Sequence, residues 1–417
     1  MEKSGKFRLT SLERNWILYD VGNSAFVLMV ATLIPVFFNA LAAAGGLSSV
    51  EYLAYWGYAS SAVTIITAVL SPILGTVADT KGFKKPIFIL CVFVGIVGCC
   101  AMGAVSAWLP FLVIFVIAKV GFSGSLVFYD SMLSDVTTPE RMDEVSSRGY
   151  AWGYIGSCVP FVVCLGLVLG AGSIGISQMT ALNLALLLTA AWWLLTTLPL
   201  LKSYKQLYYV EVEKHAVRQS FARIGHTLRH LPEDKQVFWF LLAFFCYIDG
   251  VYTIIDMATA YGTALGLDTT GLLLALLVTQ IVAFPSALIF GRLSNKYPSA
   301  KLIPVCIAAY AGIAVFAFFL TRQWQFWVLA VIVGMFQGGV QALSRSHFAK
   351  IIPPEKSGEY FGLFDICGKG ASFLGTMIVS VGSQLTGSAN VGVGSLILLF
   401  IVGFVLFRVS CRQGETA

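Results

Sequence analysis

The chain has 417 residues, of which 58% are hydrophobic and only 12% are charged, and its formal net charge is +6. Because soluble domains carry about 25% charged and about 45–50% apolar residues, this composition excludes a soluble globular protein. About 20 apolar residues cross a bilayer, so a chain of this length has room for about twelve membrane helices with short loops.

The predicted elements are apolar segments that follow a short basic N-terminus. Residues 1–14 are polar and lead into a span longer than the core of a signal peptide, so we expect no cleaved signal. Hydrophobic periodicity places twelve spans near residues 15–43, 52–78, 86–107, 109–136, 147–171, 178–201, 237–264, 270–293, 301–320, 324–351, 360–386 and 391–410. The sequence therefore predicts an all-α polytopic membrane protein.

The basic residues are distributed unevenly between the loops. The N-terminus, the loops after every second span and the C-terminus hold nearly all of the 27 lysines and arginines, whereas the loops on the other side hold Arg322. By the positive-inside rule, both termini are expected in the cytoplasm, with the protein in the cell (inner) membrane. The basic excess then contacts anionic lipid headgroups, and no nucleic-acid partner is expected.

A long polar stretch divides the spans into six plus six. We expect an N-terminal six-helix bundle over residues 1–201, a cytoplasmic linker over 202–236 and a C-terminal six-helix bundle over 237–417. Within the linker, apolar residues recur at helical spacing opposite basic ones, which predicts an amphipathic helix on the inner leaflet; these residues are Phe221, Ile224, Leu228 and Leu231.

The two halves look duplicated. Residues 139–140 (Pro-Glu) recur as residues 354–355, and at the same offset Gly124 falls on Gly339. Transporters built from internal repeats show such similarity between their halves. The repeat also places Arg345 at the position that corresponds to Asp130.

The loop after the second span is tight and basic. Its marked residues, taken as candidate gating residues, are Gly75, Asp79, Gly82, Lys84 and Lys85, followed by a proline. Glycines suit the turn and lysines suit lipid headgroups. The aspartate at the helix end could pair with a basic side chain or with the N-terminus of a neighbouring helix, in one conformation only. We therefore interpret the loop as a gate latch.

The corresponding loop in the second half is only a partial copy. Asn295 replaces the aspartate, and Pro298 and Ser299 lie where the second glycine should be.

Charged and polar residues inside spans point to a function or a partner, because insertion of an ionised group at the centre of a membrane helix costs at least ~2.5 kcal/mol of free energy. Span 1 carries Asp20 and Asn23 in a run of small residues, which lines a cavity or, alternatively, lets helices pack closely. Span 7 carries Asp249, Tyr252 and Asp256, with its two carboxylates on roughly one helical face. Two carboxylates on one face suit a water-filled path, and we take these five residues as substrate-binding candidates.

Asp130 in span 4 and Arg345 in span 10 complete the candidate substrate site. An anion in one half and a cation in the other would clamp a zwitterion; the alternative is a charge network that holds the halves together in one conformation. Coupling to protons needs a titratable group in the cavity. Asp130 and Asp249 are the first candidates, and His347 is a further one, although a lone histidine near a helix end is commonly a satisfied hydrogen-bonding group.

Enzyme chemistry has little support in this sequence. It has no G-x-S-x-G elbow, P-loop, H-E-x-x-H or paired C-x-x-C motif, and its four histidines form no metal constellation. We expect neither a catalytic site nor a metal or other cofactor. The nine cysteines lie mostly in apolar spans, where they act as small hydrophobic residues.

Two further patterns carry a resemblance to a known family. The loop from Gly75 to Pro86 resembles the G-x-x-x-D-x-x-G-x-[RK]-[RK]-P signature of the major facilitator superfamily. The runs YDVGNSAF at residues 19–26 and YIDGVYTII at 247–255 are similar to its vacuole-effluxer branch, bacterial relatives of the autophagy-linked vacuolar amino-acid exporter of fungi. Val21 and Gly22 depart from the Trp-Ala of many relatives. The resemblance implies a proton- or gradient-driven carrier, with amino-acid efflux as the best-known activity.

The function expected from these observations is secondary active transport by alternating access. The substrate would be a small polar or zwitterionic, amino-acid-like solute, moved by proton-coupled efflux through a monomer. One alternative is a multidrug or amphipathic-lipid exporter, which would require a wide aromatic cavity with few charges. Another is a non-transporting sensor or scaffold, against which the intact first latch loop argues.

Overall fold

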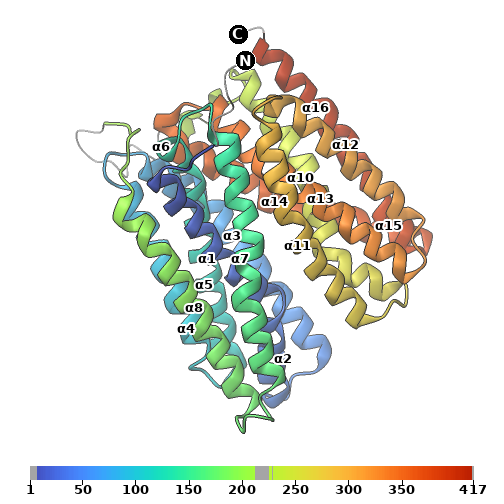
Figure 1. The fold of residues 1–417 in the computed structure, drawn as a ribbon. Coiled ribbons are helices and arrows are strands. Elements are labelled where there is room, and N and C mark those ends of the chain that lie inside the picture. Colours follow the sequence, from blue (N-terminus) through green and yellow to red (C-terminus); the bar gives the residue numbers. More distant parts are fainter. Residues whose placement is uncertain (1–6, 212–224, 228, 416–417) are drawn as a thin grey trace.

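The computed structural model describes residues 7–211, 225–227 and 229–415. Over these residues the chain folds into two helical bundles that lie side by side (Figure 1). Eleven of the described helical segments are long and apolar enough to cross a membrane. A further long helix, α14 (Ser357–Thr386), has 30 residues and completes the predicted twelve. The all-α, multi-span architecture expected from the sequence is confirmed.

The N-terminal bundle contains the elements α1 to α8. Their bounds are α1 (Ser11–Ala31), α2 (Leu33–Ala44), α3 (Ser49–Ala78), α4 (Lys84–Met102), α5 (Trp108–Ser131), α6 (Leu133–Val136), α7 (Met142–Leu169) and α8 (Gln178–Ser203). Together α1 and α2 form one 34-residue span. It is interrupted at Thr32, because Pro35 has no N–H to donate to the carbonyl one turn earlier.

The C-terminal bundle contains the elements from α10 onwards. Their bounds are α10 (Lys235–Ala264), α11 (Thr269–Leu293), α12 (Ser299–Phe318), α13 (Gln323–Ile351), the 3-10 turn η1 (Pro354–Lys356), α14, α15 (Ala389–Gly394) and α16 (Ile397–Glu415). Asp234 and Asp268 cap the starts of α10 and α11 by accepting backbone N–H bonds.

Phe221, Ile224 and Leu228 lie outside the described residues. The preceding linker segment, residues 204–211, runs along the α3–α4 loop, where Val210 donates a backbone hydrogen bond to Asp79 O at 2.8 Å.

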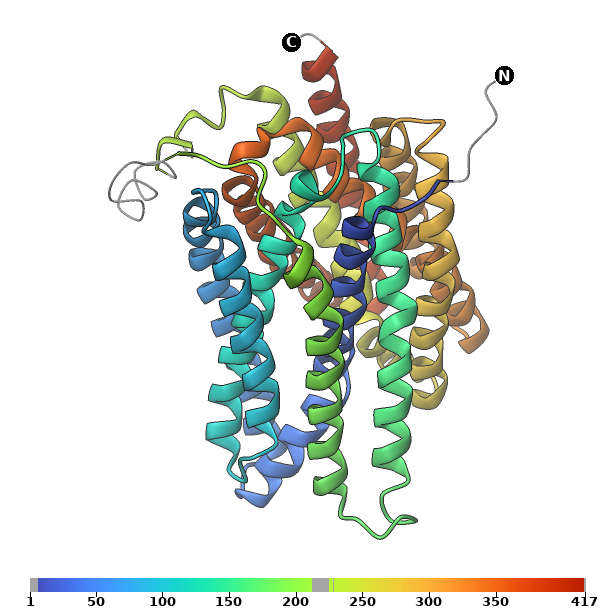
Figure 2. The same cartoon turned by 60° about the vertical axis from the view of Figure 1, so that its left-hand side comes forward.

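The bundles touch at one end of the molecule and diverge at the other. Figure 1 and Figure 2 show the first and last described residues at the same end, where the two bundles converge. The main helix pairs that join them are α3 with α14 and α7 with α11 and α13, and α5 with α14 adds to these. We call this the closed end; the tips of α2 and α15 lie toward the opposite end (Figure 1).

Candidate functional site

Arg345 of α13 reaches out of its own bundle into the N-terminal one. Its side chain is 2% exposed, and Nη1 lies 2.9 Å from Asp130 Oδ1 and 3.9 Å from Asp20 Oδ2. Nε and Nη2 donate to the side-chain and backbone oxygens of Ser146 at 2.9 and 3.0 Å. The rings around the guanidinium are those of Trp16, Tyr129 and Tyr150. The guanidinium of one bundle is therefore enclosed almost entirely by groups of the other.

Glycines on α7 make room for this charge network. A Cβ at Gly149 would lie 3.1 Å from both Arg345 Nη2 and Asp20 Oδ2, and a Cβ at Gly153 would lie 2.9 Å from Ser24 Oγ. Helix α1 packs closely along α7. The small residues of span 1 thus serve helix packing, while Asp20 of the same run also faces Arg345.

Asn23 and Tyr252 occupy different surroundings. The buried Asn23 amide donates to the Tyr19 carbonyl at 3.1 Å and lies 3.5 Å from Asp20 Oδ1, the residue whose other oxygen faces Arg345. Tyr252 of α10 is half-buried, and the charges of Asp130 and Arg345 act on its hydroxyl. Asn23 is therefore connected to Arg345 through Asp20, and Tyr252 through electrostatic interaction with the Asp130–Arg345 pair.

The two carboxylates of α10 do not share one water-filled path. Asp249 is fully buried, and Oδ1 accepts hydrogen bonds from Gly375 N at 2.9 Å and from Thr253 Oγ1 at 3.3 Å. Asp256, two turns further along, is exposed and interacts electrostatically with Lys119 of α5. The common path expected from their spacing is wrong, because α14 covers the first carboxylate and leaves the second open.

His347 lies inside the C-terminal bundle, away from the Asp130–Arg345 pair. Its Nδ1 is 3.1 Å from Ser299 Oγ, and its ring packs between Phe240 and Phe407. This is the surrounding of a hydrogen-bonding histidine in an aromatic core.

The second cluster is formed by Asp79, which ends α3 at the closed end. Its Oδ1 accepts the Gly358 N–H at 2.7 Å, and its Oδ2 accepts the Glu359 N–H at 2.8 Å. These N–H groups belong to the first turn of α14, where they have no partner within the helix and carry the positive end of its dipole. Lys84 Nζ lies 3.8 Å from the same carboxylate. Asp79 thus makes both kinds of pairing that the sequence left open.

Burial sets the electrostatics of this cluster. Asp79 is 0% exposed, and removal from water raises the pKa of its carboxyl to about 7. The Lys84 ammonium and the two α14 N–H groups oppose that rise, and the nearby Glu359 adds to it. We call the set Asp79, Lys84, Asp135, Ser357, Gly358 and Glu359 the Asp79 cluster.

Two expectations for this loop need correction. Gly75 is not a turn residue: it lies within α3 and packs on the Gly358 carbonyl, where a Cβ would collide with α14 backbone. Lys84 does not reach lipid headgroups, because it is fully buried and donates to Ser357 Oγ at 2.8 Å. Gly82 has φ +80° and does supply the turn, and Lys85 is half-buried.

Sequence reasoning missed Asp135 of α6, which lies 3.4 Å from Lys84 Nζ. It also accepts the N–H groups of Leu207 and Tyr208 at 2.9 Å and the hydroxyl of Tyr204 at 2.5 Å. The start of the linker is therefore tied to the Asp79 cluster. An acidic residue at the end of a span, close to the basic loop, was the available signal.

Sequence reasoning also missed the acidic start of α7, which bonds to the C-terminal bundle. Glu144 Oε2 accepts from Asn295 Nδ2 at 2.8 Å, and Asp143 accepts from Ser346 Oγ at 2.6 Å and pairs with Lys350 at 2.7 Å. The asparagine that replaces an aspartate in the second loop thus meets a carboxylate. Two adjacent acidic residues in a first turn were the signal.

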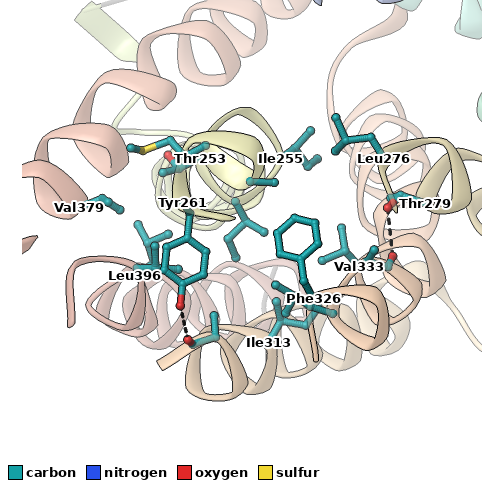
Figure 3. A pocket seen from close by; sticks show the side chains of 17 residues that line it. Thr253, Ile255, Tyr261, Leu276, Thr279, Ile313, Phe326, Val333, Val379 and Leu396 are labelled. Carbon is teal, nitrogen blue, oxygen red and sulfur yellow. Dashed lines mark hydrogen bonds between the residues drawn. The ribbon is translucent and has the colours of Figure 1, made fainter. Parts of the chain in front are cut away.

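A cavity of about 50 Å³ lies inside the C-terminal bundle and not between the bundles (Figure 3). Its lining is mostly apolar, and the hydroxyls of Tyr261 and Thr279 are bonded to the carbonyls of Ala317 and Ala330. The described residues include no group of three or more histidine, cysteine, aspartate or glutamate side chains placed to hold a metal ion. The charged network between the bundles is therefore the better candidate site for a polar solute.

Comparisons with known proteins agree with this architecture. The family model described as "Vacuole effluxer Atg22 like" matches residues 11–416. An uncharacterised MFS-type transporter, YxiO of Bacillus subtilis, is 42% identical over 98% of this chain and 97% of its own length. The autophagy-related protein 22 of Coccidioides immitis is 25% identical over 65% of this chain, and the match spans 51% of the fungal protein.

Solved structures show the same fold. The human organic anion transporter MFSD10 superposes with a TM-score of 0.72 at 14% identity, covering 95% of this chain and 98% of the other. The major facilitator FucP in its outward conformation gives 0.71 at 16% identity, covering 96% and 97%. The chain therefore belongs to the Atg22-like vacuole effluxer family and is a multi-pass membrane transporter with the major facilitator fold.

Proposed function

We propose that this transporter exports a small polar or zwitterionic, amino-acid-like solute by alternating access, coupled to protons. The observation that carries the proposal is the ion pair between Arg345 and Asp130, which places one charge of each sign on facing bundles. Asp130 keeps 20% of its side chain exposed, whereas Arg345 is enclosed.

The pair gives a zwitterion a way to replace protein contacts. When the bundles separate at the closed end, Arg345 must leave Asp130, Asp20 and Ser146. A solute carboxylate then takes the place of Asp130 at the guanidinium, and a solute ammonium group takes the place of Arg345 at the freed carboxylates. The clamp and the charge network expected as alternatives thus become two states of one site, the first with solute and the second without it.

The Asp79 cluster is proposed as the latch of this cycle. Its hydrogen bonds to α14 form only while the bundles touch, and Asn295 with Glu144 repeats the arrangement on the other side with donor and acceptor exchanged. We further propose that the closed end is cytoplasmic in the inner membrane and that the working unit is a monomer. The strong basic excess of the loops and termini at this end supports that orientation.

Flux in proteoliposomes tests the proposal. A labelled panel of amino acids, small peptides, sugars and lipophilic cations is assayed with and without an imposed pH gradient. Proton-coupled transport is supported if one class of zwitterionic solute moves, if its movement follows the pH gradient, and if the movement is lost in Asp130→Asn. Movement of amphipathic compounds alone would assign the charge network to structure and favour a multidrug or lipid exporter.

A further inference from the structure

We infer that Asp249 binds a proton inside the C-terminal bundle while the closed end is shut, and that loss of this proton loosens α14. The inference rests on the proposed proton-coupled transport and deepens it. It assigns the coupling proton to one residue outside the Asp130–Arg345 pair, and it connects that residue to the latch.

The first argument is an unpartnered buried oxygen. Asp249 is 0% exposed, and its Oδ1 accepts both hydrogen bonds, from Gly375 N and Thr253 Oγ1. Its Oδ2 has no hydrogen-bond partner among the described residues. A buried carboxylate without a counter-charge is strongly unfavourable, so such a group takes up a proton instead. A proton on Oδ2 removes the charge of the carboxylate, and Oδ1 can still accept the hydrogen bonds from Gly375 and Thr253.

The second argument concerns the groups that face Asp249. On α10 itself the titratable neighbour is Cys246. Helix α14 carries Cys367, which interacts with Cys246, and Asp365, which accepts from Ser71 Oγ of α3 at 2.8 Å. The other charged or titratable residues on the helices packed against α10 include Arg292, Lys301, Arg345, His347, Lys350, Glu359, Lys369, Arg408, Arg412 and Glu415; the Lys369 side chain lies outside the described part of the chain. Among the described residues, the groups hydrogen-bonded to Asp249 are the Gly375 N–H and the Thr253 hydroxyl, both uncharged.

A metal cation explains the site less well than a proton. Hard cations such as Ca²⁺ take about six to eight oxygen ligands, whereas the described side-chain oxygens bonded here belong to Asp249 and Thr253. A proton needs only the one free carboxylate oxygen.

The third argument is that α14 carries both contacts. A Cβ at Gly375 would lie 2.6 Å from Asp249 Oδ1, so the helix approaches this carboxylate only through a glycine. The first turn of the same helix supplies the N–H groups of Gly358 and Glu359 to Asp79. A charge that appears on Asp249 therefore acts on a helix whose other end forms the latch.

Asp249→Asn tests the bound proton directly, because asparagine keeps one accepting oxygen and cannot ionise. The infrared difference between the wild-type protein and this variant at neutral pH is expected to contain the C=O stretch of a protonated carboxyl group. The matched control is Asp256→Asn on the same helix, which removes an exposed carboxylate and should give only ionised-carboxylate bands. Ionised-carboxylate bands from Asp249 would overturn the inference. Binding of Na⁺ in place of the proton would also overturn it. In that case Na⁺ would raise the melting temperature of the wild type and not that of Asp249→Asn.

The link to the latch is tested with two spin labels in a background without the nine native cysteines. Phe83→Cys and Glu355→Cys place them on exposed positions on either side of the Asp79 cluster. At alkaline pH, Asp249→Asn is expected to reduce the open fraction at least a few-fold relative to Asp249. An unchanged distance distribution would contradict the link. Neither measurement needs a substrate, so a failed flux assay and a failed Asp249 site are distinguishable.

Discussion

The Arg345 guanidinium donates to the Asp130 carboxylate at 2.9 Å and thereby joins α13 of one bundle to α5 of the other. The same guanidinium is held by Ser146 of α7, so its contacts with the N-terminal bundle come from more than one helix. Because these contacts cross between the bundles, opening of the closed end has to break them together.

Removal of one partner of this pair should open the closed end. Arg345→Gln leaves Asp130 and Asp20 without their cation, and breaking a buried pair costs about 3 kcal/mol or more. The distance distribution between spin labels at Phe83→Cys and Glu355→Cys should shift to longer values. Adding Asp130→Asn should restore part of the closed population, since it removes one stranded charge; strictly additive effects of the two substitutions would show that the pair is not coupled.

Asp79→Asn should disturb conformational switching more than substrate affinity. The carboxylate offers an oxygen to each of two N–H groups of α14, whereas an asparagine side chain offers one oxygen and one further donor. One buried N–H is left unsatisfied, at a cost of about 1–3 kcal/mol to the closed state. The label distances should lengthen while solute binding in detergent stays close to wild type. An equal loss of binding would count against a latch.

Acidification should favour the closed state, because a protonated Asp79 loses its buried charge and still has two oxygens that can accept the two α14 N–H groups, whereas asparagine has one. The pKa of Asp79 is raised to about 7 by burial in the closed state, against 3.8 for an ordinary aspartate. An open state with this carboxylate in water binds fewer protons between these values, so closure is favoured as the pH falls and opening is favoured as the pH rises through about 7. A pH series of the label distances checks this. Asp79→Asn should flatten the series, and an unchanged slope would assign the effect to other groups.

Gly75→Ala should force α3 away from α14. A Cβ at this position would collide with the Gly358 carbonyl, and overpacking of this kind typically costs 1–3 kcal/mol. The matched control is Gly57→Ala on the same helix, where a Cβ would meet no atom within 4 Å. Label distances should lengthen in the first variant alone. Equal behaviour of the two would point to a general effect of alanine in α3.

Restoring the family aspartate in the second loop should weaken closure. Asn295 donates to Glu144, which is 2% exposed, so Asn295→Asp places two carboxylates against each other. The open fraction should rise, and a second substitution, Glu144→Gln, should reverse the rise by supplying a donor to the new carboxylate. If the closed population is unchanged in Asn295→Asp alone, the contact between Asn295 and Glu144 contributes little to the stability of the closed state.

The sequence determined the features that follow from composition and periodicity. Long apolar segments have to be helices in a membrane, because a helix satisfies its own backbone hydrogen bonds where no water is present. The spans, the basic loops and the location of buried charges could therefore be read along the chain. The motif of the first loop also marked Asp79 as a residue that pairs at a helix end.

Only the tertiary structure decided which groups meet. Side chains of one helix point in directions that depend on its rotation and on what packs against it, so spacing alone grouped Asp249 with Asp256, which α14 separates. Gly75 was assigned to a turn because glycines are common there, whereas its contact is the backbone of a helix about 280 residues later in the chain. The partners of Arg345 and one partner of Lys84, Ser357, likewise come from the opposite bundle, and no local pattern in the sequence specifies them.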